Sequence, residues 1–120
     1  MKKRVLLVDD HPKILKFLEI DLKLRGFEVI SAASGRQALE MVDSAKPDIM
    51  LLDMIMPDMD GFEVLRKLRV FSQLPVIAFS ASPEKQDVAM RLGANDFVPK
   101  PLDMTNLVTK INSLIRETDN

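Results

Sequence analysis

This chain of 120 residues lacks several residue types on which common protein chemistries depend. It has no cysteine, which excludes disulfides, thiolate metal sites and cysteine nucleophiles. It has no tryptophan or tyrosine, and aromatic residues make up only 5% of it, so a base-stacking surface is not expected. The net charge is −1 with acids and bases interspersed, so no basic stripe indicates direct contact with nucleic acid.

Long apolar segments are missing as well. The basic residues at the start are followed by an apolar stretch of only 5–8, which Asp9 and Asp10 end, so it is too short for the core of a signal peptide. No run approaches the roughly 20 apolar residues that cross a bilayer. Together with the missing cysteines, which fit a reducing compartment, these features predict a cytoplasmic protein with no membrane contact.

Apolar residues nevertheless make up 47% of the chain, enough for a single domain of residues 1–120 to bury a core. Short continuous apolar runs, which are typical of strands covered on both faces, alternate with longer segments of helical spacing. The strands are expected at 4–8, 28–33, 49–53, 75–79 and 96–99, and the helices at 13–25, 35–46, 61–71, 83–92 and 103–117. Five strand–helix units predict an α/β fold with a parallel sheet between helices on both faces.

Residues at the expected helix boundaries support these ranges. Ser34 and Asp60 each stand three residues before a Gln or Glu, which is the spacing of a capping box. Ser82 before a proline indicates an N-cap followed by proline at the first helical position. Gly26 and Gly93 occupy positions where a helix needs a left-handed residue to end.

Polar residues follow four of the expected strands directly or nearly so. They are Asp9, Asp10, Asp53, Ser80 and Lys100. Taken alone, each of these residues is a weak signal. An Asp-Asp pair after a strand, for example, more often caps a helix than binds a metal. The carboxyl ends of parallel strands meet at one edge of the sheet, where ligands of such folds bind. We therefore expect three carboxylates, one hydroxyl and one ammonium to converge there.

This set of groups indicates phosphoryl transfer. Three neighbouring carboxylates raise one another's pKa unless a cation compensates, and carboxylate oxygens with open positions for water suit Mg²⁺. Asp53 is then the nucleophile that attacks phosphorus in line. Lys100 and the metal neutralise charge on the phosphoryl oxygens, and Ser80 can hydrogen-bond the attached group.

The sequence resembles the receiver domains of response regulators in two-component signalling systems. The matching pieces are Val8-Asp9-Asp10, Asp53-Met54-Ile55-Met56-Pro57-Asp58-Met59-Asp60-Gly61, Ser80-Ala81, Gly93-Ala94-Asn95-Asp96-Phe97 and Lys100-Pro101. They occur in the order and spacing of the family, and the resemblance spans essentially all 120 residues. It implies a flavodoxin-like, doubly wound (βα)5 three-layer sandwich with strand order 2-1-3-4-5.

The resemblance also implies roles for the residues at the strand ends. Asp53 is expected to be the phosphoacceptor. Asp10, Asp53 and the backbone carbonyl of Ile55 are expected to ligate Mg²⁺, with Asp9 acting mainly through water. Lys100 is expected to contact the phosphoryl group. The peptide bond between Lys100 and Pro101 is expected to be cis, which is uncommon for X–Pro bonds in general.

A switch and its partners follow from the same resemblance. Ser80 is expected to move toward the phosphoryl group after transfer, and Phe97 to rotate inward into the space released. These movements alter the face formed by 83–92, 96–99 and 103–117. The partners implied are a sensor histidine kinase or histidine phosphotransfer protein on one side, and a downstream protein or fused output domain on the other.

Two further residues beside the expected site bear on its chemistry. Ile55 is apolar beside the phosphorylation site and cannot orient an attacking water, which predicts slow loss of the phosphoryl group. His11 follows the acidic pair, but one histidine beside oxygens of the Mg²⁺ type fits poorly as a ligand. We interpret it as the start of a helix that shapes access to the site.

Other functions remain open at this stage. A Mg²⁺-dependent phosphatase or phosphotransferase with an aspartyl nucleophile is the main alternative, although such enzymes carry the nucleophile after the first strand and usually have a cap insertion. A flavin-binding module is disfavoured because the loop after 4–8 is not rich in Ser, Thr and Gly. The leading hypothesis is a switch that catalyses only its own phosphorylation and dephosphorylation. It is either a free-standing receiver or part of a longer regulator.

Overall fold

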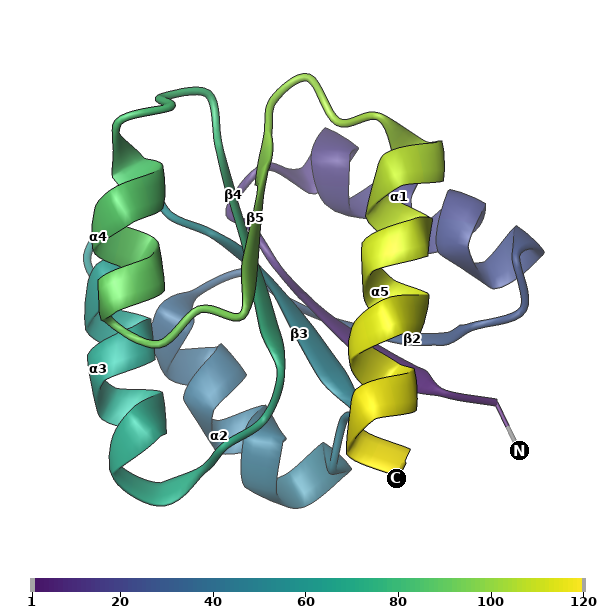
Figure 1. Cartoon of the computed structure of the whole chain (residues 1–120), viewed down its shortest axis with the longest axis horizontal. Coiled ribbons are helices and arrows are strands. Elements are labelled where there is room, and N and C mark those ends of the chain that lie inside the picture. The colour runs from purple at the N-terminus through teal and green to yellow at the C-terminus, as the bar shows by residue number, and fades with distance from the viewer. Residues whose placement is uncertain (1, 120) are drawn as a thin grey trace.

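The computed structural model describes residues 2–119, and the side chains of residues 2–116. Strands and helices alternate along the chain (Figure 1). The strands are β1 (Arg4–Val8), β2 (Glu28–Ala32), β3 (Ile49–Asp53), β4 (Val76–Ser80) and β5 (Asp96–Pro99). The helices are α1 (Pro12–Leu24), α2 (Gly35–Ala45), α3 (Gly61–Phe71), α4 (Lys85–Arg91) and α5 (Met104–Asp119).

Within the described residues the five strands form one parallel sheet in the order β2-β1-β3-β4-β5. Val5 of β1 lies opposite Val29 of β2 on one side and Ile49 of β3 on the other. Figure 1 shows α1 and α5 on one side of the sheet and α2, α3 and α4 on the other. The expected α/β, flavodoxin-like three-layer fold with strand order 2-1-3-4-5 is therefore confirmed.

Each strand contributes to two cores because successive side chains point to opposite faces of the sheet. Val5 and Leu7 pack with Leu18 of α1 and Ile111 of α5. The alternate residues of the same strand belong to the second core, with Val64 and Leu68 of α3. This double burial explains why the strands are continuous apolar runs instead of alternating ones.

Most of the expected boundary residues act as predicted. The hydroxyl of Ser34 and the carboxylate of Asp60 each accept the backbone N–H three residues on, at 3.2 and 3.0 Å. Gly26 and Gly93 have φ values of +97° and +110°, in the region that glycine adopts without steric cost. These four residues therefore define where α2 and α3 begin and where α1 and α4 end.

The expected start of α4 is wrong. The helix begins at Lys85 and not at residue 83, and its N-cap is Glu84 instead of Ser82. The backbone N–H groups of Lys85 and Gln86 donate to carbonyls only three residues back, those of Ser82 and Pro83. These bonds make a tighter turn than an α-helix, so the proline lies in a leading turn and α4 has only seven residues.

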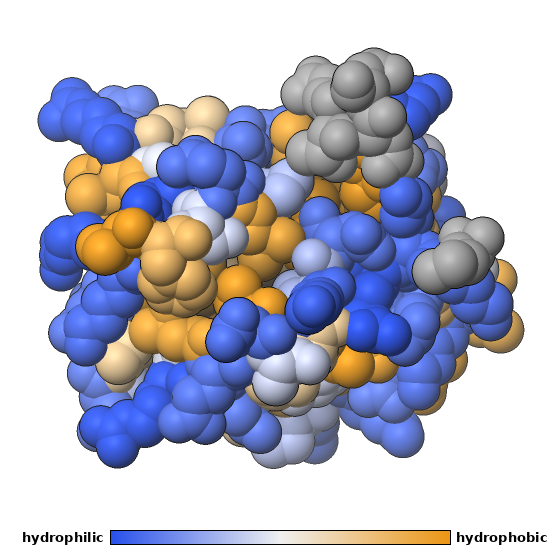
Figure 2. All heavy atoms as spheres, turned by 90° about the horizontal axis from the view of Figure 1, so that it is seen from below, coloured by the Kyte–Doolittle hydropathy of each residue, from blue (hydrophilic) through white to orange (hydrophobic). Residues whose placement is uncertain are grey.

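The surface carries apolar side chains as well as charged ones. Figure 2 shows the face at the amino ends of the strands, where hydrophilic side chains predominate and an apolar area lies in the left half. Val70 and Phe71 at the end of α3 are exposed, by 86% and 57%. Among the helices of residues 2–119, none has the length and apolar character required to cross a lipid bilayer.

Candidate functional site

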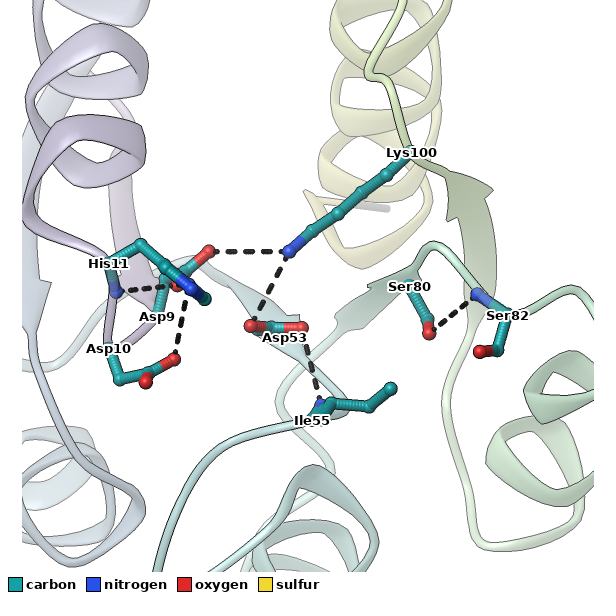
Figure 3. A network of polar contacts seen from close by, with 8 residues as sticks. All are labelled: Asp9, Asp10, His11, Asp53, Ile55, Ser80, Ser82 and Lys100. Carbon is teal, nitrogen blue, oxygen red and sulfur yellow. Dashed lines mark hydrogen bonds and ion pairs between the residues drawn. The ribbon is translucent and has the colours of Figure 1, made fainter.

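The carboxyl ends of β1, β3, β4 and β5 bring together the five polar residues singled out in the sequence (Figure 3). Asp53 is the last residue of β3 and Ser80 the last of β4, while Asp9 directly follows β1. All three are buried, with at most 1% of their surface exposed. The two acids are therefore held at the edge of an apolar core, where an uncompensated charge is costly.

Lys100 supplies a positive charge to this pocket. Its Nζ lies 3.5 Å from Oδ2 of Asp53 and 3.9 Å from Oδ2 of Asp9. The ammonium also lies 5.2 Å from the centre of the Phe79 ring, which limits where it can move. The peptide bond between Lys100 and Pro101 is cis, as expected from the resemblance.

Asp53 has an unusual protonation equilibrium. Burial, reinforced by the negative charge of Asp9, raises its pKa from 3.8 to about 6. The backbone N–H of Ile55, which donates to Oδ1 of Asp53 at 3.3 Å, and the ammonium of Lys100 both oppose this increase in pKa. Without a bound metal ion, the ionised form of Asp53 therefore predominates only above about pH 6.

His11 lies closer to the acids than its interpretation as a helix start suggested. It is the N-cap residue of α1, as expected, but its side chain makes no capping hydrogen bond. Its backbone N–H donates to Oδ1 of Asp9 at 2.9 Å, and its Nδ1 lies 3.0 Å from the same oxygen and 3.3 Å from Oδ1 of Asp10. Hydrogen bonding to Asp9 and the charges of Asp10 and Asp9 raise the pKa of His11.

The donor set fits a divalent cation. One ligand atom each from Asp9, Asp10, His11 and Asp53 lies within 4.8 Å of the others. Oδ2 of Asp9, Oδ1 of Asp10 and Oδ2 of Asp53 are buried and have no hydrogen-bond partner among the described residues. Buried carboxylate oxygens without such partners are costly, and a hard cation compensates them. The role of the Ile55 carbonyl stays a prediction.

Ser80 and Phe97 occupy defined positions beside the acids. The hydroxyl of Ser80 accepts the backbone N–H of Ser82 at 3.1 Å, and Figure 3 shows it directed to that side. Phe97 is only 5% exposed and belongs to the core between the sheet and α2, α3 and α4. The ring thus already lies inside, and the movements expected of these two residues stay predictions.

One partly buried polar network was missed in the sequence. The guanidinium of Arg69 on α3 donates to the carbonyl of Gly93 through Nε and Nη2, at 3.0 and 2.8 Å, and to Oδ1 of Asn95 at 3.1 Å. Burial lowers the pKa of Arg69. These contacts link α3 to the turn before β5 across more than twenty residues, so no local pattern could indicate them. His11 differs, since an Asp two residues before it is a local spacing that allows a side-chain turn.

Comparison with known proteins agrees with this geometry. A family model described as the response regulator receiver domain matches residues 5–112. The probable transcriptional regulator ycf27 of Cyanophora paradoxa is 39% identical over 121 aligned positions, covering 99% of this chain and 51% of that protein. The transcriptional regulatory protein KdpE of Mycobacterium tuberculosis is 40% identical over 114 positions, 93% of this chain and 50% of that protein. The chain thus spans about half the length of these relatives.

Solved structures lead to the same family. The chemotaxis protein CheY4 of Vibrio cholerae superposes with a TM-score of 0.87 at 32% identity, covering 95% of this chain and 99% of that one. The receiver domain of the Francisella response regulator 1452 superposes with a TM-score of 0.91 at 30% identity, covering 98% and 99%. With its acidic pocket, its lysine and its strand order, this chain belongs to the response regulator receiver domain family of two-component systems.

Proposed function

We propose that this chain is a phosphorylation-dependent switch in which Asp53 accepts a phosphoryl group from a histidine kinase or a histidine phosphotransfer protein. The observation that carries the proposal is the ammonium of Lys100, 3.5 Å from a buried Asp53 carboxylate whose Oδ2 makes no hydrogen bond within the described part of the chain. The family match supports it independently. In this function the chain modifies itself and turns over no separate substrate.

The transfer step requires few groups. An oxygen of the ionised Asp53 carboxylate forms a bond to phosphorus as the donor's phosphorus–nitrogen bond breaks. The electron pair of the broken bond stays on the imidazole of the donor, which takes up a proton from solvent. Lys100 neutralises negative charge on the phosphoryl oxygens during transfer and on the aspartyl phosphate afterwards.

The three acids fit a magnesium site, which Asp10, Asp53 and the carbonyl of Ile55 would hold directly and Asp9 would support through water. When bound, Mg²⁺ neutralises charge on the phosphoryl oxygens, as divalent ions do in phosphoryl transfer generally. A bound ion would also compensate the buried carboxylate oxygens that make no hydrogen bonds in the described structure. Lys100 alone supplies one positive charge against three carboxylates.

The output is proposed to pass through Ser80 and Phe97 to the face formed by α4, β5 and α5. The hydroxyl of Ser80 would exchange the N–H of Ser82 for a phosphoryl oxygen, and the buried ring of Phe97 would be retained inside. Relatives of about twice the length bear names of transcriptional regulators. We infer that this face controls a downstream protein or a fused output domain, in a cytoplasmic pathway.

Labelling with a small phosphodonor tests the proposal directly. Acetyl phosphate with Mg²⁺ should add one phosphoryl group to the protein, measured by intact mass, and hydroxylamine should remove it. Asp53→Asn should abolish the label because the amide is not a nucleophile. Asp43→Asn, an exposed acid on α2, is the matched control and should label normally.

Two results would contradict the switch. Undiminished labelling of Asp53→Asn would assign the phosphoacceptor to another residue. Continuous turnover of a soluble phosphate ester would favour a Mg²⁺-dependent phosphatase instead.

Ile55 sets a second expectation, for the lifetime of the phosphoryl group. Its side chain is 52% exposed beside Asp53 and has no polar group to orient water. Ile55→Asn should therefore accelerate hydrolysis of the aspartyl phosphate, by about tenfold or more if the amide positions the attacking water. The decay of the labelled mass over time measures the rate. Ile55→Leu is the control, and equal rates in all three proteins would disprove the role of residue 55.

A further inference from the structure

The side chain of His11 faces the acidic pocket and not the solvent side of α1. Figure 3 shows its ring beside Asp9 and Asp10, across the pocket from Ser80. Nδ1 lies 3.0 Å from Oδ1 of Asp9 and 3.3 Å from Oδ1 of Asp10. The histidine side chain is 59% exposed, so it can adjust its position without disturbing the core.

These separations are those of neighbouring ligands on one metal ion. Ligands about 2.1 Å from a shared cation lie about 3.0 Å apart at right angles and about 3.4 Å apart in a tetrahedron. Both distances from Nδ1 fall within that interval. A cation can therefore replace the contacts of Nδ1 with a small movement of the ring.

The carboxylates provide an independent sign of a ligand. Asp9 is fully buried and Asp53 is 1% exposed, yet an oxygen of each makes no hydrogen bond within the described structure. Oδ1 of Asp10 also makes no hydrogen bond, although the side chain of Asp10 is 26% exposed and this oxygen lies 3.3 Å from Nδ1 of His11. Lys100 is the cation on the far side of these acids, 3.5 Å from Asp53 but in contact with neither Asp10 nor His11 in the described ion pairs. The side of the pocket nearest His11 is thus rich in negative charge.

Nitrogen changes which ions such a pocket prefers. Mg²⁺ prefers oxygen ligands, whereas imidazole suits Zn²⁺ and Co²⁺. The chain has one histidine and no cysteine, so His11 is its single imidazole or thiol side chain, the nitrogen and sulfur ligands that Zn²⁺ uses in proteins. If this pocket binds Zn²⁺ or Co²⁺ more tightly than carboxylates alone would, the additional affinity must come from His11.

We propose that His11 is a metal ligand, and that it adds to the pocket of Asp9, Asp10 and Asp53 a binding mode for a transition-metal dication of the Zn²⁺ class. The bond is a coordinate one from Nδ1, which releases a proton when the ring is protonated. This mode uses the acids of the proposed magnesium site, so it rests in part on the proposed function. Its consequence is regulatory, since a tightly held Zn²⁺ ion excludes Mg²⁺ and blocks phosphorylation.

Calorimetric titration of the untagged chain with Zn²⁺ alone, near about pH 7.5 where the imidazole can release its proton, tests the proposal. His11→Gln should lower Zn²⁺ affinity by at least about tenfold, a loss typical even of residues that only support a ligand. The same variant should change Mg²⁺ affinity by less than about twofold, because imidazole is not a magnesium ligand. The control is Lys13→Gln, which introduces the same amino acid at an exposed position of α1 and should leave both affinities unchanged.

Imidazole NMR gives a second readout that does not depend on affinity. The single histidine yields one set of ring resonances, and Zn²⁺ should shift them while Mg²⁺ leaves them nearly unmoved. Unmoved resonances with Zn²⁺, or equal Zn²⁺ affinity in His11→Gln, would overturn the proposal. A loss of Zn²⁺ and Mg²⁺ affinity by the same factor would also overturn it, since His11 would then only position the carboxylates.

Acetyl phosphate labelling separates this inference from the switch itself. With Mg²⁺ as the only divalent ion, His11→Gln should label at Asp53 as the unaltered chain does. Added Zn²⁺ should suppress labelling of the unaltered chain at lower concentrations than it does for the variant. If the unaltered chain failed to label at all, the proposed function would fall, while the calorimetry and NMR would still decide the role of His11.

Discussion

The amino and carboxyl edges of the sheet differ in how their polar groups are paired. At the amino edge, Oδ2 of Asp48 accepts the backbone N–H of Arg4 at 2.7 Å. The guanidinium of Arg4 in turn contacts Glu28 at 2.9 Å and the carbonyl of Ala45. At the carboxyl edge, by contrast, an oxygen of Asp53 is buried with no hydrogen bond in the described structure.

This difference shows where the fold gains stability and where it keeps a functional charge. Paired polar groups at the amino edge each add a modest amount to stability. Clustered carboxylates at the carboxyl edge repel one another, and burial raises the pKa of Asp53 to about 6. Repulsion among the carboxylates at the carboxyl edge therefore lowers the stability of the fold, and a bound cation or proton restores it. Three substitutions, ordered by expected effect, test the contrast.

Gly61→Ala should have the largest effect, a loss of about 3 kcal/mol in the free energy of unfolding. A Cβ at Gly61 would lie 2.7 Å from the carbonyl oxygen of Asp53 and 2.7 Å from the Cα of Met54, and neither backbone atom can move without shifting β3. Urea denaturation followed by circular dichroism measures the loss.

Gly35→Ala is the matched control, because Gly35 also opens a helix directly after its N-cap. The Cβ there would meet side-chain atoms of Val64 and Met59, which can adjust more readily than backbone. If Gly61→Ala lowered the free energy of unfolding no more than Gly35→Ala does, the approach of α3 to the Asp53 backbone would not be tight.

Asp53→Asn should stabilise the metal-free protein by about 2 kcal/mol above about pH 7, less than the about 3 kcal/mol that the full pKa shift represents, because the amide of asparagine is itself a buried polar group. The pKa of Asp53 is raised from 3.8 to about 6, so the folded state binds its proton more tightly than the unfolded state. Ionisation therefore costs stability as pH rises from about 4 through about 6, and asparagine removes that cost. The gain should vanish below about pH 4, where both states of the original carboxyl are protonated.

Chemical denaturation below about pH 4 and above about pH 7, with a chelator present, measures the gain in the free energy of unfolding. Mg²⁺ should stabilise the unaltered protein and narrow its difference from Asp53→Asn. A gain that is independent of pH would contradict an origin in the ionisation of Asp53. A loss of stability at neutral pH would contradict the contrast between the two edges.

Asp48→Ala should have the smallest effect, a loss of about 1 kcal/mol that does not respond to Mg²⁺. The substitution leaves the backbone N–H of Arg4 without its acceptor at the start of β1. Asp43→Ala, at an exposed position of α2, provides the control for loss of an acid. Equal stability of the two variants would show that the amino edge gains little from its pairing.

Much of the fold could be predicted from residue order because its signals are local. Continuous apolar runs identified β1, β3 and β4, and weaker runs identified β2 and β5, all to within one residue at either end. The N-caps Ser34 and Asp60 were recognised by spacing. The start of α4 was missed because the proline there fits both a first helical turn and the tighter turn that forms. Local chemistry allowed both conformations.

The candidate site divides in the same way. Alternating strands and helices determine that Asp9, Asp53 and Lys100 meet, since parallel strands place their carboxyl ends at one edge. Which way the ring of His11 turns, and which group the Ser80 hydroxyl contacts, could not be read from the chain. Several rotamers of an exposed or edge side chain have similar intrinsic energies, so neighbouring elements select among them.

The order of elements, the double-sided burial of the strands and the set of residues at their ends follow from residue order, because these depend on short-range periodicity and chain direction. The 3.5 Å approach of Lys100 to Asp53, the raised pKa of that carboxyl and the link from Arg69 to Gly93 arise only when the chain is folded. Such features depend on distances between groups far apart in the chain, and burial makes the energies of those distances large.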